Sequence, residues 1–98
     1  MTLTEIQNLI RRDEFILSEK VSDMEDAGEF TEKDVASCVL SADRISKTER
    51  DEKYQAIDGK KYTIIGRDVA GLPFYTTGKV LADYRGRFYF FITAHTAD

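Results

Sequence analysis

The chain has 98 residues, of which 42% are hydrophobic, 11% are aromatic and one is proline, a composition typical of a folded globular domain. A net charge of −4 argues against general affinity for nucleic acid, which normally requires an excess of basic residues. With one cysteine and one histidine, the chain lacks the residues for an internal disulfide or a structural zinc site, so we expect no metal and no cofactor.

The chain begins with residues that favour a helix. Thr2 and Glu5 form the pattern of a capping box, and apolar residues then recur with helical period, which predicts a helix over about residues 3–12. No basic segment leads into an apolar run at this end, and no apolar stretch is long enough to span a bilayer. We therefore expect a cytoplasmic protein that does not associate with membranes.

Two shorter helices are predicted next. The first starts near Ser18 and ends at Gly28, because glycine tolerates the left-handed backbone that closes many helices. The second covers about residues 32–41, follows the capping residue Thr31 and places Cys38 on its apolar stripe. We expect Cys38 to be a small core residue and not a nucleophile.

Four strands are predicted after these helices. The charged segment 44–50 is predicted to be an edge strand, since charges on an edge discourage pairing with other chains. Three stronger strand patterns, separated by turn-forming residues, follow over 61–67, 73–82 and 87–95. Connections this short favour antiparallel hairpins. The sequence therefore predicts an α+β fold with two or three N-terminal helices packed on one face of a four-stranded, mainly antiparallel sheet.

Charge and aromatic residues are divided unevenly between the two halves of the chain. Residues 1–50 carry 7 basic and 12 acidic side chains, whereas residues 51–98 carry 7 basic and 6 acidic side chains and nine of the eleven aromatic residues. We expect this division to reflect two layers of one domain that spans residues 1–98. The helical layer would cover about 1–43 and the antiparallel sheet about 44–96.

The two faces of the predicted sheet differ in composition, because successive side chains of a strand point to opposite faces. The apolar set is expected to face the helices: Tyr62, Ile64, Phe74, Thr76, Val80, Phe88, Phe90, Ile92 and Ala94. The other set is expected on an outer face that is cationic and aromatic: Lys61, Thr63, Ile65, Arg67, Tyr75, Thr77, Lys79, Arg87, Tyr89, Phe91, Thr93 and His95. Any half-solvated sheet exposes such residues for structural reasons, so the pattern defines a candidate surface only.

Four short motifs follow one another along the chain. They are a helix cap (Thr31, Glu32, Lys33, Asp34, Val35), a first strand (Tyr62, Ile64, Gly66), a second strand (Gly71, Pro73, Phe74, Gly78, Lys79) and a final strand (Ile92, Thr93). In this order and spacing they resemble a bacterial family described as domain of unknown function 4258. The resemblance covers about residues 15–96.

Members of that family look related to the RelE-like toxins, small ribonucleases that place helices on one side of an antiparallel sheet and meet RNA on the other. The resemblance therefore implies an RNA substrate, an antitoxin as partner, and a His or Tyr that takes part in cleavage at the end of the last strand, where His95 lies. The family helix usually carries a His and a following Arg, whereas this chain has Glu19 or Lys20 and Asp23. This departure permits a catalytically inactive relative.

Metal-independent RNA cleavage requires an acid, a base and cations that hold the phosphate. The single histidine suits the acid or base role because an imidazole titrates near neutral pH, and the alternative is an exposed residue near a frayed chain end. Gly78 before Lys79 indicates a bulge or a close approach that could aim the lysine. The candidate catalytic residues are His95, Arg67, Lys79 and Arg87, and the candidate RNA- or partner-binding residues are Lys61, Tyr75, Tyr89 and Phe91.

Two classes of function remain open from the sequence. The first is a RelE-like toxin that cleaves RNA. The second is a non-enzymatic interaction domain, or an inactive toxin relative, whose outer apolar patch or edge strand docks a protein partner. A homodimer through the outer face would conceal the same patch. The two classes differ in whether the four candidate catalytic residues converge around one hollow.

Overall fold

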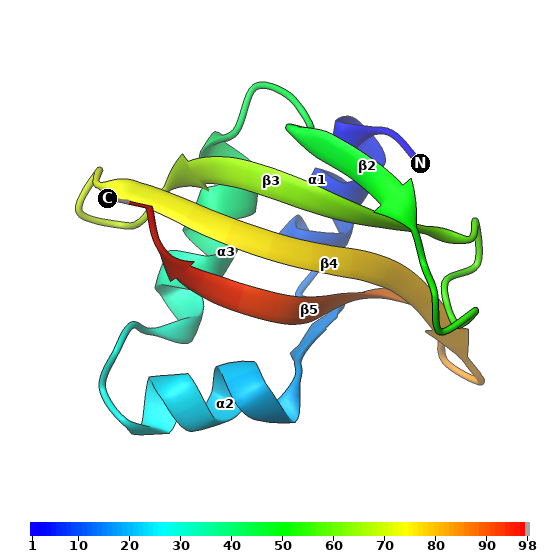
Figure 1. Cartoon of the computed structure of the whole chain (residues 1–98), viewed down its shortest axis with the longest axis horizontal. Helices are drawn as coiled ribbons and strands as arrows, with labels where there is room; N and C mark the ends of the chain where they lie inside the picture. Colours follow the sequence, from blue (N-terminus) through cyan, green and yellow to red (C-terminus); the bar gives the residue numbers. More distant parts are fainter. Residues whose placement is uncertain (98) are drawn as a thin grey trace.

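The computed structural model describes residues 1–97 and has an α+β fold with two layers (Figure 1). Within these residues, three helices accompany one five-stranded mixed sheet. The helices are α1 (Leu3–Arg11), α2 (Glu19–Asp26) and α3 (Glu32–Ser41), and the strands are β1 (Phe15–Leu17), β2 (Lys47–Arg50), β3 (Lys60–Arg67), β4 (Pro73–Asp83) and β5 (Gly86–Thr96). The order of the strands across the sheet is β1-β5-β4-β3-β2.

The helices begin where the capping patterns predicted. Thr2 caps α1 and Thr31 caps α3, each within a complete capping box. The Ser18 hydroxyl caps α2 by accepting a hydrogen bond of 3.2 Å from the backbone N–H of Val21. Gly28 follows α2 with a left-handed φ of 82°, a conformation that glycine adopts without strain. The three predicted helices are therefore confirmed, to within about two residues at their ends.

The sheet has one strand more than the sequence predicted. The short strand β1 lies at the edge and runs parallel to β5, with Phe15 opposite Tyr89 and Leu17 opposite Phe91. The other neighbours, β2 with β3, β3 with β4 and β4 with β5, are antiparallel as expected. The prediction of four strands is wrong because three residues between two helices show no alternation that would reveal a strand.

A bulge in β5 reverses the direction of the side chains in its first half. Thr77 pairs with Thr93, but the next residue, Gly78, pairs with Phe91, so Ile92 is an extra residue on β5. One extra residue moves every earlier side chain of the strand to the opposite face. The predicted faces are therefore correct for β3 and β4 but wrong for β5 before the bulge.

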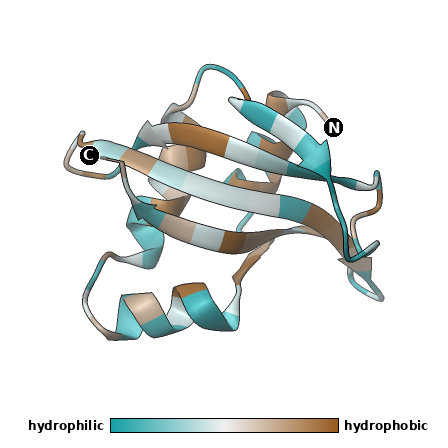
Figure 2. Ribbon diagram, in the orientation of Figure 1, coloured by the Kyte–Doolittle hydropathy of each residue, from teal (hydrophilic) through white to brown (hydrophobic). Residues whose placement is uncertain are grey.

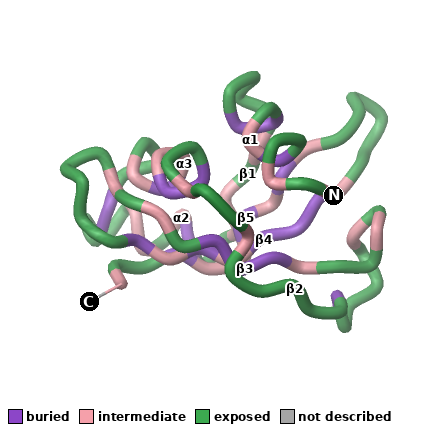
Figure 3. Tube along the Cα trace, turned by 90° about the horizontal axis from the view of Figure 1, so that it is seen from above, coloured by how far each residue is buried: buried purple, intermediate pink, exposed green. Residues whose placement is uncertain are grey.

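The core lies between the helices and one face of the sheet, the helix-facing side (Figure 3). At Gly66 of β3, an added Cβ would overlap the carbonyl oxygen of Cys38, so α3 lies directly against the backbone of this strand. The Cys38 thiol donates to the carbonyl oxygen of Phe74 at 3.3 Å, and burial raises its pKa to about 11. Cys38 is thus a core residue, as predicted. By contrast, the edge strand β2 is mostly hydrophilic (Figure 2) and exposed along its length.

Candidate functional site

Three of the eight predicted site residues lie at one end of the sheet, on the outer face that the helices leave uncovered. Tyr75 of β4 pairs with His95 of β5, and their rings stack with centroids 4.4 Å apart and an angle of 17° between the planes. Tyr75 also pairs with Ile65 of β3, so Arg67, two residues further along, lies on the same face at the same end. The structure therefore brings a histidine, an aromatic ring and a cation together here.

Two contacts hold this cluster in place. The Nδ1 atom of His95 lies 2.8 Å from the carbonyl oxygen of Thr96, and the other ring nitrogen, Nε2, takes no part in this contact. The Arg67 Nη1 atom donates to the carbonyl oxygen of Gly71 at 2.9 Å, in the turn between β3 and β4. His95 and Arg67 are both exposed, so a ligand on the outer face could reach either side chain.

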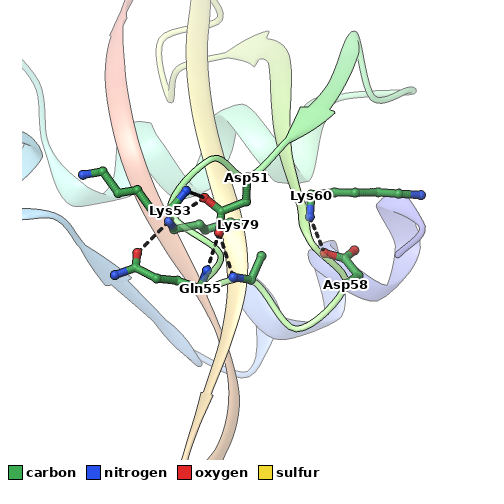
Figure 4. Close-up of polar contacts among 7 residues, drawn as sticks. Asp51, Lys53, Gln55, Asp58, Lys60 and Lys79 are labelled. Atoms are coloured by element: carbon green, nitrogen blue, oxygen red, sulfur yellow. Dashed lines mark hydrogen bonds and ion pairs between the residues drawn. The ribbon is translucent and has the colours of Figure 1, made fainter.

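Lys79 lies on the same face but is only 2% exposed. Its ammonium group donates to Asp51 Oδ1 at 3.1 Å and to Gln55 Oε1 at 2.8 Å (Figure 4). The loop after β2 covers this pair, so a phosphate could reach Lys79 only by displacing Asp51. The expected close approach at Gly78 is present, because an added Cβ there would overlap the ring of Tyr89, but the bulge itself lies on β5.

Asp51 organises the loop that covers Lys79, although it is not among the site residues predicted from the sequence. Its carboxylate accepts hydrogen bonds from the backbone N–H groups of Lys53 (3.2 Å), Gln55 (2.8 Å) and Ala56 (2.7 Å) as well as from Lys79. Burial alone would raise the pKa of this carboxyl, but the hydrogen bonds outweigh it and hold the pKa well below its ordinary range. An aspartate that opens a polar turn was the signal available in the sequence.

The same loop holds Tyr54 in an unusual position. Its backbone has a left-handed φ of 55°, and its side chain is 82% exposed.

Lys61, at the start of β3, is half-buried and lies opposite Glu49 of β2, whose carboxylate forms an ion pair of 3.6 Å with Lys47. Lys61 therefore lies beside an acidic group, not among free cations.

Three further predicted residues lie on the helix-facing side. Tyr89 and Phe91 are fully buried, and Phe91 packs edge-to-face against Phe15 with ring centroids 5.7 Å apart. Their predicted place on the outer face is wrong because of the bulge, and neither ring is accessible to RNA or to a partner. Arg87 shares their face and borders a small hollow with residues of α1, including Glu5.

Distance along β5 also separates two of the candidate catalytic residues. Arg87 pairs with Ala82 and His95 pairs with Tyr75, so the two lie at opposite ends of the strand. Eight residues of strand at about 3.3 Å each place them roughly 25 Å apart. They also point to opposite faces of the sheet, so they do not border one hollow.

Apolar and aromatic side chains lie towards both ends of the outer face. Ile16 of β1, which pairs with half-buried Phe90, is 40% exposed, and Ile65 of β3, which pairs with half-buried Tyr75, is 47% exposed. The paired residues Thr63, Thr77 and Thr93 lie between these two groups. We call the apolar and aromatic set the outer apolar band, and its members are Ile16, Phe88, Phe90, Leu81, Tyr75 and Ile65. At each end of the outer face, exposed apolar side chains from neighbouring strands lie side by side, which is typical of interaction sites.

Among residues 1–97, no three His, Cys, Asp or Glu side chains are grouped so that they could hold a metal ion. In the same residues, no helix has the length and apolar character needed to cross a bilayer. No protein-family model matches the chain, and searches of curated proteins and of solved structures also found no match.

Proposed function

We propose that this protein acts by binding another protein through the outer face of its sheet, and that it is not an enzyme. The outer apolar band is the observation that carries the proposal. Helices pack against the opposite face (Figure 3), and the loop of Asp51 packs onto the outer face at Lys79. Exposed aromatic and apolar side chains on a rigid sheet are suited to contact a protein surface.

The positions of the candidate catalytic residues also favour binding over cleavage. A general acid and the cations that stabilise a phosphate must contact the same phosphate group. Lys79 is neutralised by Asp51 under a loop, and Arg87 lies at the far end of β5 on the other face. Only Arg67 and His95 share a face and an end of the sheet.

On this proposal, the protein is an inactive relative of the RelE-like toxins that retained a binding role. Three observations support this. The helices lie on one side of an antiparallel-rich sheet, the opposite face is open, and α2 carries Glu19, Lys20 and Asp23 where a basic pair would be expected.

Two experiments test the binding function. The purified protein should not cleave RNA in the absence of added metal. A photo-crosslinking residue placed at Ile65, inside the band, should give a discrete heavier adduct in the cells that produce the protein. The same residue at Val69, which is 66% exposed but lies in the turn after β3, should not. RNA cleavage by the wild type, together with no adduct from Ile65, would contradict the proposal.

One observation favours a second candidate, which is RNA cleavage at the end of the sheet where His95 stacks on Tyr75 near Arg67. An exposed imidazole beside an aromatic ring could act as acid or base while the ring stacks on a nucleobase. If this candidate is correct, wild-type protein cleaves RNA and His95→Ala abolishes the activity. Cleavage that survives in His95→Ala would exclude this histidine from the mechanism.

A further inference from the structure

We propose that β1 is a docking edge to which an extended, positively charged segment of a partner protein adds as a further strand of the sheet. This inference rests on the proposed protein-binding function and specifies where the partner's backbone attaches and which charge it carries. Three features of the region around β1 carry it: an open strand edge, two hollows that meet at β1, and an excess of acidic over basic side chains.

The first feature is the open edge. β1 lies at the end of the strand order, and its hydrogen bonds to β5 lie on one side only. The backbone N–H of Tyr89 donates to Glu14 at 3.0 Å, and the N–H of Ser18 donates to Phe91 at 3.0 Å. Because backbone groups alternate in direction along a strand, the N–H and C=O groups of Phe15 and Leu17 point to the open side.

The second feature is a pair of hollows that meet at β1. The larger, of about 890 Å³, lies between α1, α3 and β1, and its apolar wall includes Ile10, Phe15 and Leu40. The smaller, of about 230 Å³, lies between the start of β1 and the turn that joins β4 to β5, on the β5 side of the strand. Side chains of an added strand that point to the helix-facing side would therefore enter the larger hollow.

The third feature is charge. Residues 11–34, which contain the end of α1 together with β1 and α2, carry nine acidic and four basic side chains, a net charge of −5. Each of the two hollows is lined by three acidic and two basic side chains. A segment rich in lysine or arginine would be attracted to this edge. A second copy of the chain paired through β1 would bring two such acidic segments together, and a nucleic acid would be repelled in the same way. Charge therefore selects a cationic protein segment over both alternatives.

The test uses a library of linear twelve-residue peptides displayed on phage, selected on the full-length protein. We expect the selected peptides to alternate apolar residues with lysine or arginine, and to bind more weakly as salt is raised. Leu17→Pro removes the N–H that faces the open edge while leaving the bonds to β5, and proline is tolerated at such a position. Leu17→Ala is the matched control, because it shortens the same side chain and keeps the N–H.

Binding of the selected peptides should fall about tenfold more in Leu17→Pro than in Leu17→Ala, the effect of one lost hydrogen bond. Circular dichroism checks that both variants are folded. In the wild type, which avoids any doubt about folding, peptide binding should slow hydrogen exchange at the amides of Phe15 and Leu17. Equal binding by the two variants, exchange slowed only elsewhere, or a selection without basic peptides would overturn the inference.

Self-association is a separate outcome of the same variants. If the wild type forms dimers that Leu17→Pro abolishes and Leu17→Ala does not, the edge belongs to a second copy and the inference fails. None of these outcomes bears on the crosslinking at Ile65 or on the RNA assay. Failure of the docking edge is therefore distinguishable from failure of the proposed function.

Discussion

Phe90 and Phe91 are neighbours in β5, yet they lie on faces of the sheet that are covered in different ways. Phe91 is fully buried among apolar side chains on the helix-facing side, whereas Phe90 is half-buried in the outer apolar band. The helix-facing side is enclosed by α1, α2 and α3, while the outer face is covered by the loop of Asp51 at Lys79. The comparison teaches that one bulge, and not composition, decides which aromatic residues become core and which remain available for binding.

The two faces also bury polar groups differently. On the helix-facing side the Thr76 hydroxyl donates to the carbonyl oxygen of Ile64, and the Tyr89 hydroxyl is the one buried side-chain polar atom without a hydrogen-bond partner among residues 1–97. Burial raises the pKa of Tyr89, so this hydroxyl stays protonated. On the outer face the buried polar residues are Thr63 and the ion pair of Lys79 with Asp51. The stability of the helix-facing side therefore depends on apolar packing, and that of the outer face near Lys79 depends on the ion pair with Asp51.

Replacing the two adjacent phenylalanines tests this comparison most strongly. Phe91→Ala should lower the free energy of unfolding by about 3–5 kcal/mol, because it empties a closed part of the core. Phe90→Ala should lower it by about 1 kcal/mol, because its ring is already partly in water. Urea denaturation measures both values. A larger loss for Phe90→Ala would mean that β5 has no bulge and that simple alternation holds.

Breaking the ion pair under the loop should have the next largest effect. Asp51→Asn leaves the buried ammonium of Lys79 without a charged partner and should cost about 3 kcal/mol. The matched control is Glu49→Gln, which breaks the exposed pair with Lys47 and should cost about 0.5 kcal/mol or less. Both are measured by urea denaturation at neutral pH. Similar costs for the two variants would show that the loop does not bury its charges.

The carboxylate of Asp51 should also make the stability of the protein sensitive to acid. Its pKa is lowered in the folded protein, so the stability it contributes is present above the pKa of an unfolded aspartate, about 3.9, and is lost as pH falls through the lower folded value. The difference in unfolding free energy between wild type and Asp51→Asn should therefore shrink as pH falls below about 4. Denaturation curves between pH 7 and pH 2 measure it. A constant difference would contradict the assigned direction of the shift.

The smallest effect is expected at the exposed end of the outer face. His95→Ala removes a ring that stacks on Tyr75 in contact with solvent and should change the unfolding free energy by about 0.5 kcal/mol or less. Thermal unfolding followed by circular dichroism is sufficient to measure it. A loss of several kcal/mol would show that His95 supports the fold, and its use as a functional probe would then be compromised.

Local signals in the sequence were sufficient for much of this fold. The capping residues Thr2, Ser18 and Thr31 act within one turn of helix, and each helix begins directly after them. Strands β3 and β4 follow the expected alternation because no irregularity interrupts them before Gly78. Where neighbours in sequence determine the structure, prediction from sequence succeeded.

The parts that failed depend on contacts between distant residues. The strand β1 exists because it pairs with β5, and the bulge accompanies the close packing of Tyr89 on Gly78, neither of which is visible in a short window. For the candidate site, the sequence placed Tyr75 and His95 on the outer face correctly. It could not show that Lys79 is paired, because its partner Asp51 lies 28 residues away in a polar turn.

The pairing of β1 with β5 imposes an order on folding during protein synthesis. The hydroxyl of Ser18, just after β1, donates to the carbonyl oxygen of Ile92, 74 residues later. β1, the first strand to leave the ribosome, therefore cannot pair until β5, the last of the described strands, has been synthesised. At about 5–20 residues per second, that delay is about 4–15 seconds. During it, Phe15 and Leu17 have no sheet to join. A nascent chain that stalls before residue 86 would therefore present them to chaperones and proteases.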